Sequence, residues 1–238
     1  MLKPTPQIEE THRHFEVAAA LPGSGFTRRR MLTASAAIAG TGLTPAFGQQ
    51  PGTQPTNGQI LGPFYPVRQP ADQDADLTII AGKDTRALGQ VLYLSGRVTN
   101  VRGEAIVDAE LDIWQANAAG RYNHPADRNP AAIDPNFEGF AKIRTGPDGS
   151  YRIKTVKPGA YPATPDWMRP PHIHFDVKGR ASRLVTQMYL ESEELNDKDK
   201  LLQDASRKEG LIARYRAPSG LQDSNALVAV WNIVLIAG

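Results

Sequence analysis

Seven short stretches in which polar and apolar residues alternate occupy the chain from residue 91 onward, separated by turns that contain glycine or proline. Gly146-Pro147-Asp148-Gly149 is a hairpin turn, and Lys157-Pro158-Gly159 is a second turn. Alternation with a period of two places one face of each strand in a core. The pattern therefore predicts an all-β fold, an antiparallel β-sandwich. We expect its strands at residues 92–98, 109–114, 141–144, 151–154, 172–177, 184–190 and 226–236.

Two segments differ from this pattern. Residues 193–208 look helical and are highly charged, so we expect one short surface helix there. Residues 49–90 show no period, and as far as residue 76 they are rich in Pro, Gly, Gln and Asp, which predicts an N-terminal extended arm. The aromatic segment Gly62-Pro63-Phe64-Tyr65-Pro66 is unusual for a solvated linker. We expect it to dock on a domain that spans residues 91–238.

The first 48 residues have the features of a targeting segment. Arg28-Arg29 forms a twin-arginine signature, residues 31–47 are weakly apolar, and Ala46-Phe47-Gly48 is a small-x-small cleavage site. The apolar run contains two glycines and a proline and is too short for a comfortable membrane span. The alternative is a basic patch before an ordinary helix. We predict a twin-arginine signal peptide at 1–48, a periplasmic or extracellular location, and no membrane span after its removal.

Charge and cysteine content exclude several classes of protein. The chain has 27 basic and 25 acidic residues, and removing residues 1–48 leaves 22 of each, so nothing resembles a nucleic-acid footprint. Cysteine is absent, which excludes disulfides, thiolate metal sites and a cysteine nucleophile.

His172-Ile173-His174 is the most informative motif for chemistry. In a strand, the two histidines point to the same face, as two metal ligands on one rigid element would. The alternative is a half-buried strand with two structural histidines. His124 could complete a three-ligand zinc site, but no zinc motif accompanies it. A cupin-like site would need a glutamate shortly downstream and a later histidine, and neither is present.

Tyrosine phenolates are the other available donors. A phenol has a pKa of about 10, so a hard, highly charged cation such as ferric iron must deprotonate it. Tyr122 and Tyr161 lie in turn-rich stretches from which each side chain could be directed at a neighbouring strand. For either tyrosine alone, a packed structural role is the ordinary interpretation. The hypothesis depends on the combination of two tyrosines with two histidines.

Four segments in the same order resemble the intradiol ring-cleavage dioxygenases, with the greatest likeness to the metal-bearing (beta) subunits of the protocatechuate 3,4-dioxygenases. The segments are Trp114-Gln115-Ala116-Asn117-Ala118-Ala119-Gly120-Arg121-Tyr122, Asp134-Pro135-Asn136-Phe137, Lys157-Pro158-Gly159-Ala160-Tyr161-Pro162, and Trp167-Met168-Arg169-Pro170-Pro171-His172-Ile173-His174-Phe175. The likeness runs from about residue 62 to residue 236.

This resemblance implies a site. The iron ligands would be Tyr122, Tyr161, His172 and His174, which would hold non-haem Fe(III), and Tyr161 would be the ligand that leaves when substrate binds. Arg169 resembles the arginine that stabilises negative charge on the substrate ring.

Three further residues receive roles in the same way. Gln187 resembles a glutamine near the oxygen pocket, and Tyr65 resembles part of a segment that lines the substrate cleft. Ala163 stands where members that act on protocatechuate commonly have tryptophan, which opens the pocket and argues against protocatechuate itself. Trp114 is interpreted as a packing residue.

The implied activity is cleavage of a catechol-type ring between its two hydroxylated carbons, with both atoms of O2 entering a cis,cis-muconate. The partners implied are a small catecholic substrate, O2 and a homo-oligomer, with residues 91–238 as the catalytic domain. The long helical N-terminal region of the catechol and hydroxyquinol 1,2-dioxygenases is missing. Two alternatives stay open at this point. One is a non-catalytic β-sandwich module that binds carbohydrate or protein, and the other is a zinc or copper enzyme that uses the two histidines.

Overall fold

A computed structural model describes residues 53–216, 223 and 225–237, and it confirms the all-β prediction. The predicted signal peptide at 1–48, with its cleavage site, lies outside these residues. The strands are β1 (Val91–Asn100), β2 (Glu110–Gln115), β3 (Phe140–Arg144), β4 (Ser150–Val156), β5 (Tyr161–Thr164), β6 (Trp167–Arg169), β7 (His172–Lys178), β8 (Arg183–Leu190), β9 (Ile212–Arg216), β10 (Leu227–Val230) and β11 (Ile233–Leu235). The helical segments are the 3-10 turns η1 (Asn196–Lys198) and η2 (Lys208–Leu211) and the helix α1 (Lys200–Gln203).

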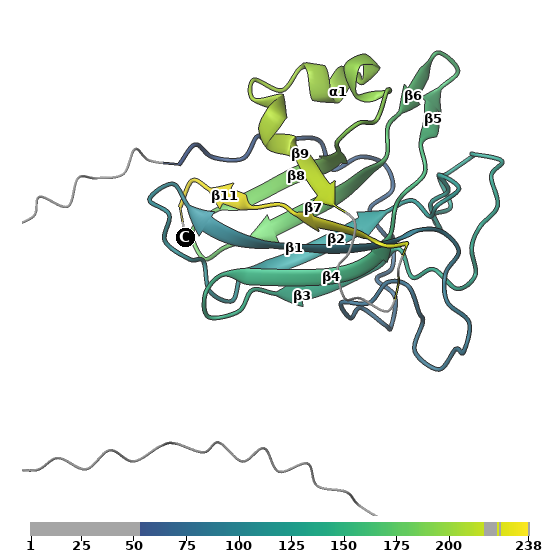
Figure 1. The fold of residues 1–238 in the computed structure, drawn as a ribbon, viewed down its shortest axis with the longest axis horizontal. Helices are drawn as coiled ribbons and strands as arrows, with labels where there is room; N and C mark the ends of the chain where they lie inside the picture. The colour runs from purple at the N-terminus through teal and green to yellow at the C-terminus, as the bar shows by residue number, and fades with distance from the viewer. Residues whose placement is uncertain (1–52, 217–222, 224, 238) are drawn as a thin grey trace, which may run out of the picture. The chain divides into compact units, whose positions relative to one another are not determined.

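The strands form two layers that face each other. One layer contains β4, β1, β10 and β11, and the other has the order β8-β7-β2-β3. Strand β9 pairs with both β10 and β8, so one continuous hydrogen-bonded path turns from the first layer into the second (Figure 1). The core between the layers contains Phe175 of β7, whose ring lies 6.1 Å from that of Tyr151 on β4 and 5.0 Å from that of Trp231 (centroid to centroid).

The sandwich is not purely antiparallel, which corrects the sequence prediction. Strand β1 pairs in parallel with both β10 and β11, and β8 pairs in parallel with β9. The predicted strand at 226–236 is also two strands, interrupted at Trp231. There the Trp231 amide donates to the Ser95 carbonyl (2.8 Å) and its own carbonyl accepts from the Tyr151 hydroxyl (2.7 Å). A Cβ on Gly96 would lie 1.8 Å from that carbonyl oxygen, so glycine is required for this close approach.

A buried amide joins the two layers beside the end of β2. Gln115 donates to the Val156 carbonyl on β4 (2.9 Å), and its side-chain oxygen accepts from the Thr155 hydroxyl (2.9 Å). Buried polar groups are tolerated when such partners satisfy them. This contact fixes the point at which the chain leaves β2 for the loop that carries Tyr122.

Three strands and the extent of the helix were not predicted. The short hairpin β5–β6 projects beyond the two layers (Figure 1), and β9 follows η2. Within the predicted helical segment, only α1 is α-helical. Its N-cap, Asp199, is fully buried although the segment lies at the surface.

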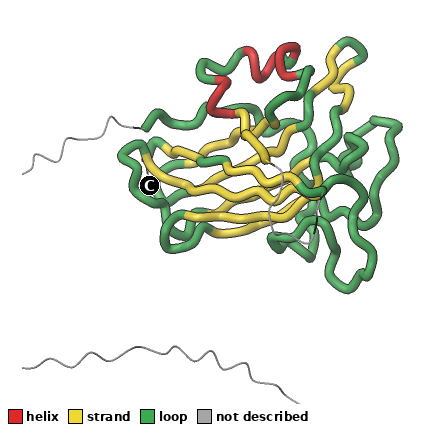
Figure 2. Tube along the Cα trace, viewed as in Figure 1, coloured by secondary structure: helices red, strands yellow, loops and turns green. Residues whose placement is uncertain are grey.

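Residues 53–90 contain no helix or extended strand and run along the body. The Thr56 amide donates to the Val234 carbonyl (3.0 Å), and the Gln59 amide donates to the Val185 carbonyl (2.8 Å). Long loops gather at the end of the layers where β2 ends and β7 begins (Figure 2). Among the described residues, no helix is long and apolar enough to cross a membrane.

Candidate metal centre

Four buried aromatic side chains meet at the loop end of the sandwich. Tyr122 lies in the loop after β2, Tyr161 is the first residue of β5, and His172 and His174 lie on β7. Their ring centroids form a closed circuit: Tyr161 to His172 is 5.5 Å, His172 to His174 is 4.9 Å, His174 to Tyr122 is 6.2 Å, and Tyr122 to Tyr161 is 5.4 Å. The structure therefore brings together the four residues that the resemblance implies as ligands.

Strand geometry places the two histidines. Strand β7 lies between β2 and β8, so its backbone is paired on both sides, and residues 172 and 174 share one face. The Trp114 ring stacks on His174 with centroids 4.8 Å apart and planes 12° apart. Gly62 has a φ of +78°, and a Cβ there would come within 3.2 Å of the His174 ring, so glycine favours this close approach of the arm.

Loop contacts place the two tyrosines. The Asn117 side-chain oxygen accepts from the Ala119 and Arg121 amides (2.9 Å each), and an Asp127 carboxylate oxygen accepts from the Tyr122 amide (2.7 Å). The Gly159 amide donates to the Asn117 carbonyl (2.9 Å), which joins the loop before Tyr122 to the segment before Tyr161.

The same two segments approach so closely that side chains would not fit between them. A Cβ on Gly120, which has a φ of +78°, would lie 2.2 Å from the Ala160 carbonyl oxygen. A Cβ on Gly159 would lie 2.4 Å from the Gly120 nitrogen. Glycine at both positions therefore permits the two tyrosines to meet.

The cluster contains buried polar atoms that have no hydrogen-bond partner. These are the Tyr122 hydroxyl, Nε2 of His172, and both ring nitrogens of His174. Nδ1 of His172 lies 2.7 Å from the Pro170 carbonyl oxygen, and that oxygen can only accept, so Nδ1 carries the proton and Nε2 has a free lone pair. Because unpaired buried polar groups are costly, this donor set fits a bound cation.

The protonation states suit a metal. Burial, reinforced by Arg169, lowers the pKa of His174 to about 3, and the same causes lower the pKa of His172, so both imidazoles are neutral at physiological pH. Burial raises the pKa of the Tyr122 phenol, and Tyr161 adds to this shift. Burial also raises the pKa of the Tyr161 phenol, although the Arg169 charge opposes it. A strongly charged cation is therefore needed to form either phenolate.

Arg169 lies opposite Tyr161 in the β5–β6 pairing and is 4% exposed. Its guanidinium donates to Asp199 (2.6 Å), to the side-chain oxygen of Gln187 (2.7 Å) and to the Tyr189 hydroxyl (3.0 Å). Sequence reasoning missed Asp199 and Tyr189. Tyr189 lies two residues after Gln187 on β8, so alternation could have placed it on the same face.

Gln187 holds the arm as well as Arg169. Its side-chain nitrogen donates to the Ile60 carbonyl (3.0 Å), and Tyr189 donates to the Gln59 side-chain oxygen (2.9 Å). Both ends of the Gln187 amide therefore have protein partners. Its position supports a role in orienting Arg169 more than direct contact with a small ligand.

Phe64, rather than Tyr65, covers the tyrosine pair. The Phe64 ring stacks on Tyr122 with centroids 4.5 Å apart and meets Tyr161 edge-on at 5.9 Å. The Tyr65 hydroxyl donates to Asp112 (2.8 Å), and its ring packs edge-on against Trp114. Ala163 is exposed on the β5–β6 hairpin, two residues after Tyr161.

The three-ligand alternatives receive no support. His124 is half-buried beside Phe64, with ring centroids 5.8 Å apart, and its Nδ1 accepts from the Ala126 amide (3.1 Å). In the part of the chain that the structure describes, the one group of three His, Asp or Glu ligand atoms within 4.8 Å of one another is Asp72, Asp74 and Glu138. His172 and His174 therefore lack the third ligand of this kind that a zinc or cupin-like site needs.

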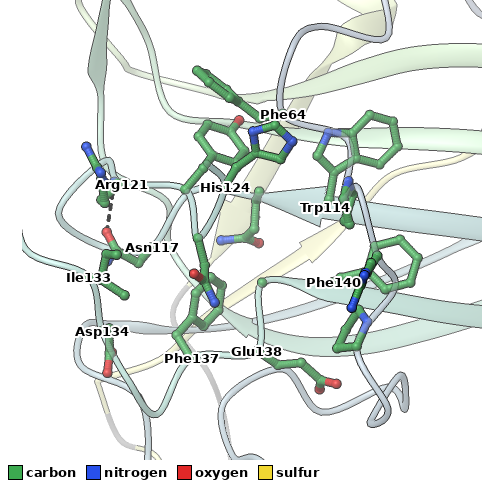
Figure 3. Close-up of a pocket in the computed structure, with 17 residues that line it drawn as sticks. Phe64, Trp114, Asn117, Arg121, His124, Ile133, Asp134, Phe137, Glu138 and Phe140 are labelled. Atoms are coloured by element: carbon green, nitrogen blue, oxygen red, sulfur yellow. Dashed lines mark hydrogen bonds between the residues drawn. The ribbon is translucent and has the colours of Figure 1, made fainter. Parts of the chain in front are cut away.

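A cavity of about 110 Å³ adjoins the aromatic cluster. Figure 3 shows Phe64, His124 and Trp114 on one side of it, with Phe137 and Glu138 on the other. Tyr122 also lines this cavity, which therefore reaches one of the four predicted ligands.

Comparison with known proteins identifies the family of this chain. The family model described as Dioxygenase (Dioxygenase_C) matches residues 60–237. The chain is 38% identical over 179 residues to the protocatechuate 3,4-dioxygenase beta chain of Burkholderia cepacia, which covers 73% of this chain and 76% of that protein. It is 27% identical over 208 residues to the hydroxyquinol 1,2-dioxygenase of Nocardioides simplex. That match covers 81% of this chain and 66% of that protein.

The fold also matches a solved structure. The dioxygenase domain of a dioxygenase carbohydrate-binding protein fusion from Streptomyces sp. SirexAA-E superposes with a TM-score of 0.59 at 25% identity, over 78% of this chain and 100% of that one. A non-catalytic binding module is therefore not favoured, because the relatives are named as enzymes. The chain belongs to the intradiol ring-cleaving dioxygenases, a family of oxidoreductases that includes the protocatechuate, catechol and hydroxyquinol dioxygenases.

Proposed function

We propose that the protein is a non-haem Fe(III) dioxygenase in which Tyr122, Tyr161, His172 and His174 hold the iron. The observation that carries this proposal is the closed circuit of the four buried rings, with unpaired atoms on Tyr122, His172 and His174. Ferric iron bound there would act as a Lewis acid that withdraws electron density from a catecholate and makes its ring reactive toward O2. Two phenolates would offset much of its charge.

The protein side chains have distinct tasks in this reaction. Tyr161 would be the ligand that substrate displaces, and its phenolate oxygen would then take a proton from a substrate hydroxyl. Arg169 lies beside Tyr161 and presents a fixed positive charge where negative charge develops on the ring. Asp199, Gln187 and Tyr189 hold its guanidinium in place. The bond between the two hydroxylated carbons breaks, and both oxygen atoms of O2 enter a cis,cis-muconate.

The oligomeric state stays a prediction. The relative in Burkholderia cepacia is named as a beta chain, which supports an assembly of more than one subunit. Light scattering of the purified single chain measures its mass, and a monomer at all concentrations would contradict the predicted homo-oligomer.

The first prediction concerns the ligand set. Iron-loaded protein should be burgundy, because tyrosinate-to-iron charge transfer absorbs visible light. Tyr122→Phe should shift or weaken this band, and His174→Ala should lose most of the iron, measured by elemental analysis. Tyr215→Phe is the matched control, since Tyr215 lies on β9 outside the cluster, and it should leave the band unchanged. Colourless wild-type protein without iron would contradict the proposal.

The second prediction concerns Arg169. Arg169→Met should lower kcat about 100-fold, because a preorganised charge beside the developing anion is lost. The charge-transfer band should persist, since Arg169 is not a proposed ligand. Arg180→Met, at an exposed arginine in the turn between β7 and β8, is the control and should keep its kcat. Equal kcat values for Arg169→Met and wild type would rule out the assigned role.

The third prediction concerns the substrate. O2 uptake should occur with at least one of catechol, protocatechuate, hydroxyquinol, gallate, and chlorinated or methylated catechols. Ala163 is small and exposed, so Ala163→Trp should lower kcat/KM for chlorinated and methylated catechols about tenfold relative to protocatechuate. An unchanged ratio would remove Ala163 from the substrate pocket, whereas no uptake with any of these compounds would contradict the activity.

The fourth prediction concerns location. We propose export by the twin-arginine route, which the Arg28-Arg29 pair, the apolar run and the small-x-small site support. Changing both arginines to lysine keeps the charge and should abolish accumulation of the protein outside the cytoplasm, measured by fractionation. Changing Arg30 alone to lysine should have little effect. Unchanged export of the double variant would contradict this route.

A further inference from the structure

Three aspartates alternate in the arm, and none of them belongs to the aromatic cluster. Asp72, Asp74 and Asp76 have the spacing that opens a calcium-binding loop. That motif continues with glycine at its sixth position and glutamate at its twelfth, where this chain has Leu77 and Lys83. The motif is incomplete, so a further carboxylate must come from elsewhere in the fold.

The loop before β3 supplies that carboxylate. Asp72, Asp74 and Glu138 each offer an oxygen atom, and these three atoms lie within 4.8 Å of one another. Backbone hydrogen bonds join the two segments, since the Glu138 amide donates to the Leu77 carbonyl (3.2 Å) and the Lys142 amide donates to the Gln73 carbonyl (2.9 Å). These backbone hydrogen bonds therefore hold the two segments, and with them the three carboxylates, close together.

Glu138 gives a second and independent indication of a ligand. It is 9% exposed, and both of its carboxylate oxygens are buried without a hydrogen-bond partner. Burial, and then the charges of Asp72, Asp74 and Asp76, raise the pKa of Glu138 to about 8. Nζ of Lys154 lies 3.6 Å from a carboxylate oxygen of Asp76 and 3.9 Å from one of Asp223, so its charge is shared between these two aspartates. A buried carboxylate in this position needs either a proton or a bound cation.

Hydrogen bonds from backbone amides also hold the carboxylates of Asp72 and Asp74 in place. One oxygen of Asp72 accepts from the Ala81 amide (2.6 Å), and one oxygen of Asp74 accepts from the Asp76 amide (2.7 Å). These bonds fix the direction of each carboxylate and use only one of its two oxygens.

We propose that Asp72, Asp74 and Glu138 bind a calcium ion that joins the arm to the loop before β3. Three carboxylates provide the hard oxygen donors that calcium prefers, and irregular loops suit its flexible geometry better than the strict octahedron of magnesium. Glu138 also lines the cavity that reaches Phe64 and Tyr122, so the ion would stiffen the wall of that cavity. The proposal does not depend on the iron site.

The test uses the full chain, purified in metal-depleted buffer and titrated with calcium chloride. At ten times the Kd, calcium should raise the Tm of the wild type by about 3 to 6 °C. Glu138→Gln should lose this response, and Asp74→Asn should weaken calcium binding about tenfold or more in calorimetry, because each variant removes one charged ligand. Glu194→Gln, at an exposed glutamate outside the cluster, is the matched control and should respond like the wild type.

A second measurement, the pH dependence of the Tm, addresses the protonation of Glu138 in the absence of calcium. A carboxyl group with a raised folded-state pKa contributes stability below its unfolded pKa, and this contribution is lost as pH rises through the folded value. Without calcium, the Tm of the wild type should therefore fall between about pH 5 and pH 8 relative to Glu138→Gln, and calcium should restore it at pH 8. A calcium response retained in Glu138→Gln, an equal response to magnesium, or none in the wild type would overturn the proposal.

Discussion

Four aromatic rings with polar edges meet at one buried position, and the other features of the site follow from this constraint. Tyr122, Tyr161, His172 and His174 are all buried, and three of them carry polar atoms without a partner. Burial lowers the pKa of both histidines and raises the pKa of both tyrosines, so the cluster is uncharged without a cation. The proposed ferric ion would provide a partner for one unpaired atom on each of these three side chains, and a less charged ion would form phenolates less readily.

Two kinds of scaffold hold these proposed ligands, and they differ in rigidity. The histidines lie on β7, which is paired on both sides, so backbone hydrogen bonds fix their positions. Tyr122 comes from a loop and Tyr161 from the start of β5, and the segments before them approach closely because Gly120 and Gly159 have no Cβ. The proposed departure of Tyr161 from the metal would be easier from a loop or a short hairpin than from the middle of a sheet. Tyr161, at the start of the two-stranded β5–β6 hairpin, has such a position.

Local patterns explain which parts of the fold were predictable. Alternation identified the long strands, and it placed His172 and His174 on one face. It failed for β5 and β6, which are only four and three residues long, and at Trp231, where contacts with β1 and Tyr151 interrupt the strand. Whether Phe64 or Tyr65 covers the tyrosine pair depends on how the arm docks on the body. The identities of these two residues do not determine that docking.

Asp199 shows most clearly why the rest of the site needed the structure. In the sequence it is one charge in a polar segment, 30 residues from Arg169, and its surroundings predict a solvated surface helix. In the fold one of its oxygens binds Arg169, while the other accepts from the Leu202 amide and caps α1. The N-cap of a surface helix is usually solvated, so the capping contact by itself does not explain why the Asp199 carboxylate is buried. The buried ion pair gives the segment a second task, because Asp199 neutralises part of the Arg169 charge and fixes its direction beside Tyr161. The short helix therefore belongs to the support of the site, although no residue of α1 lies in the ring cluster.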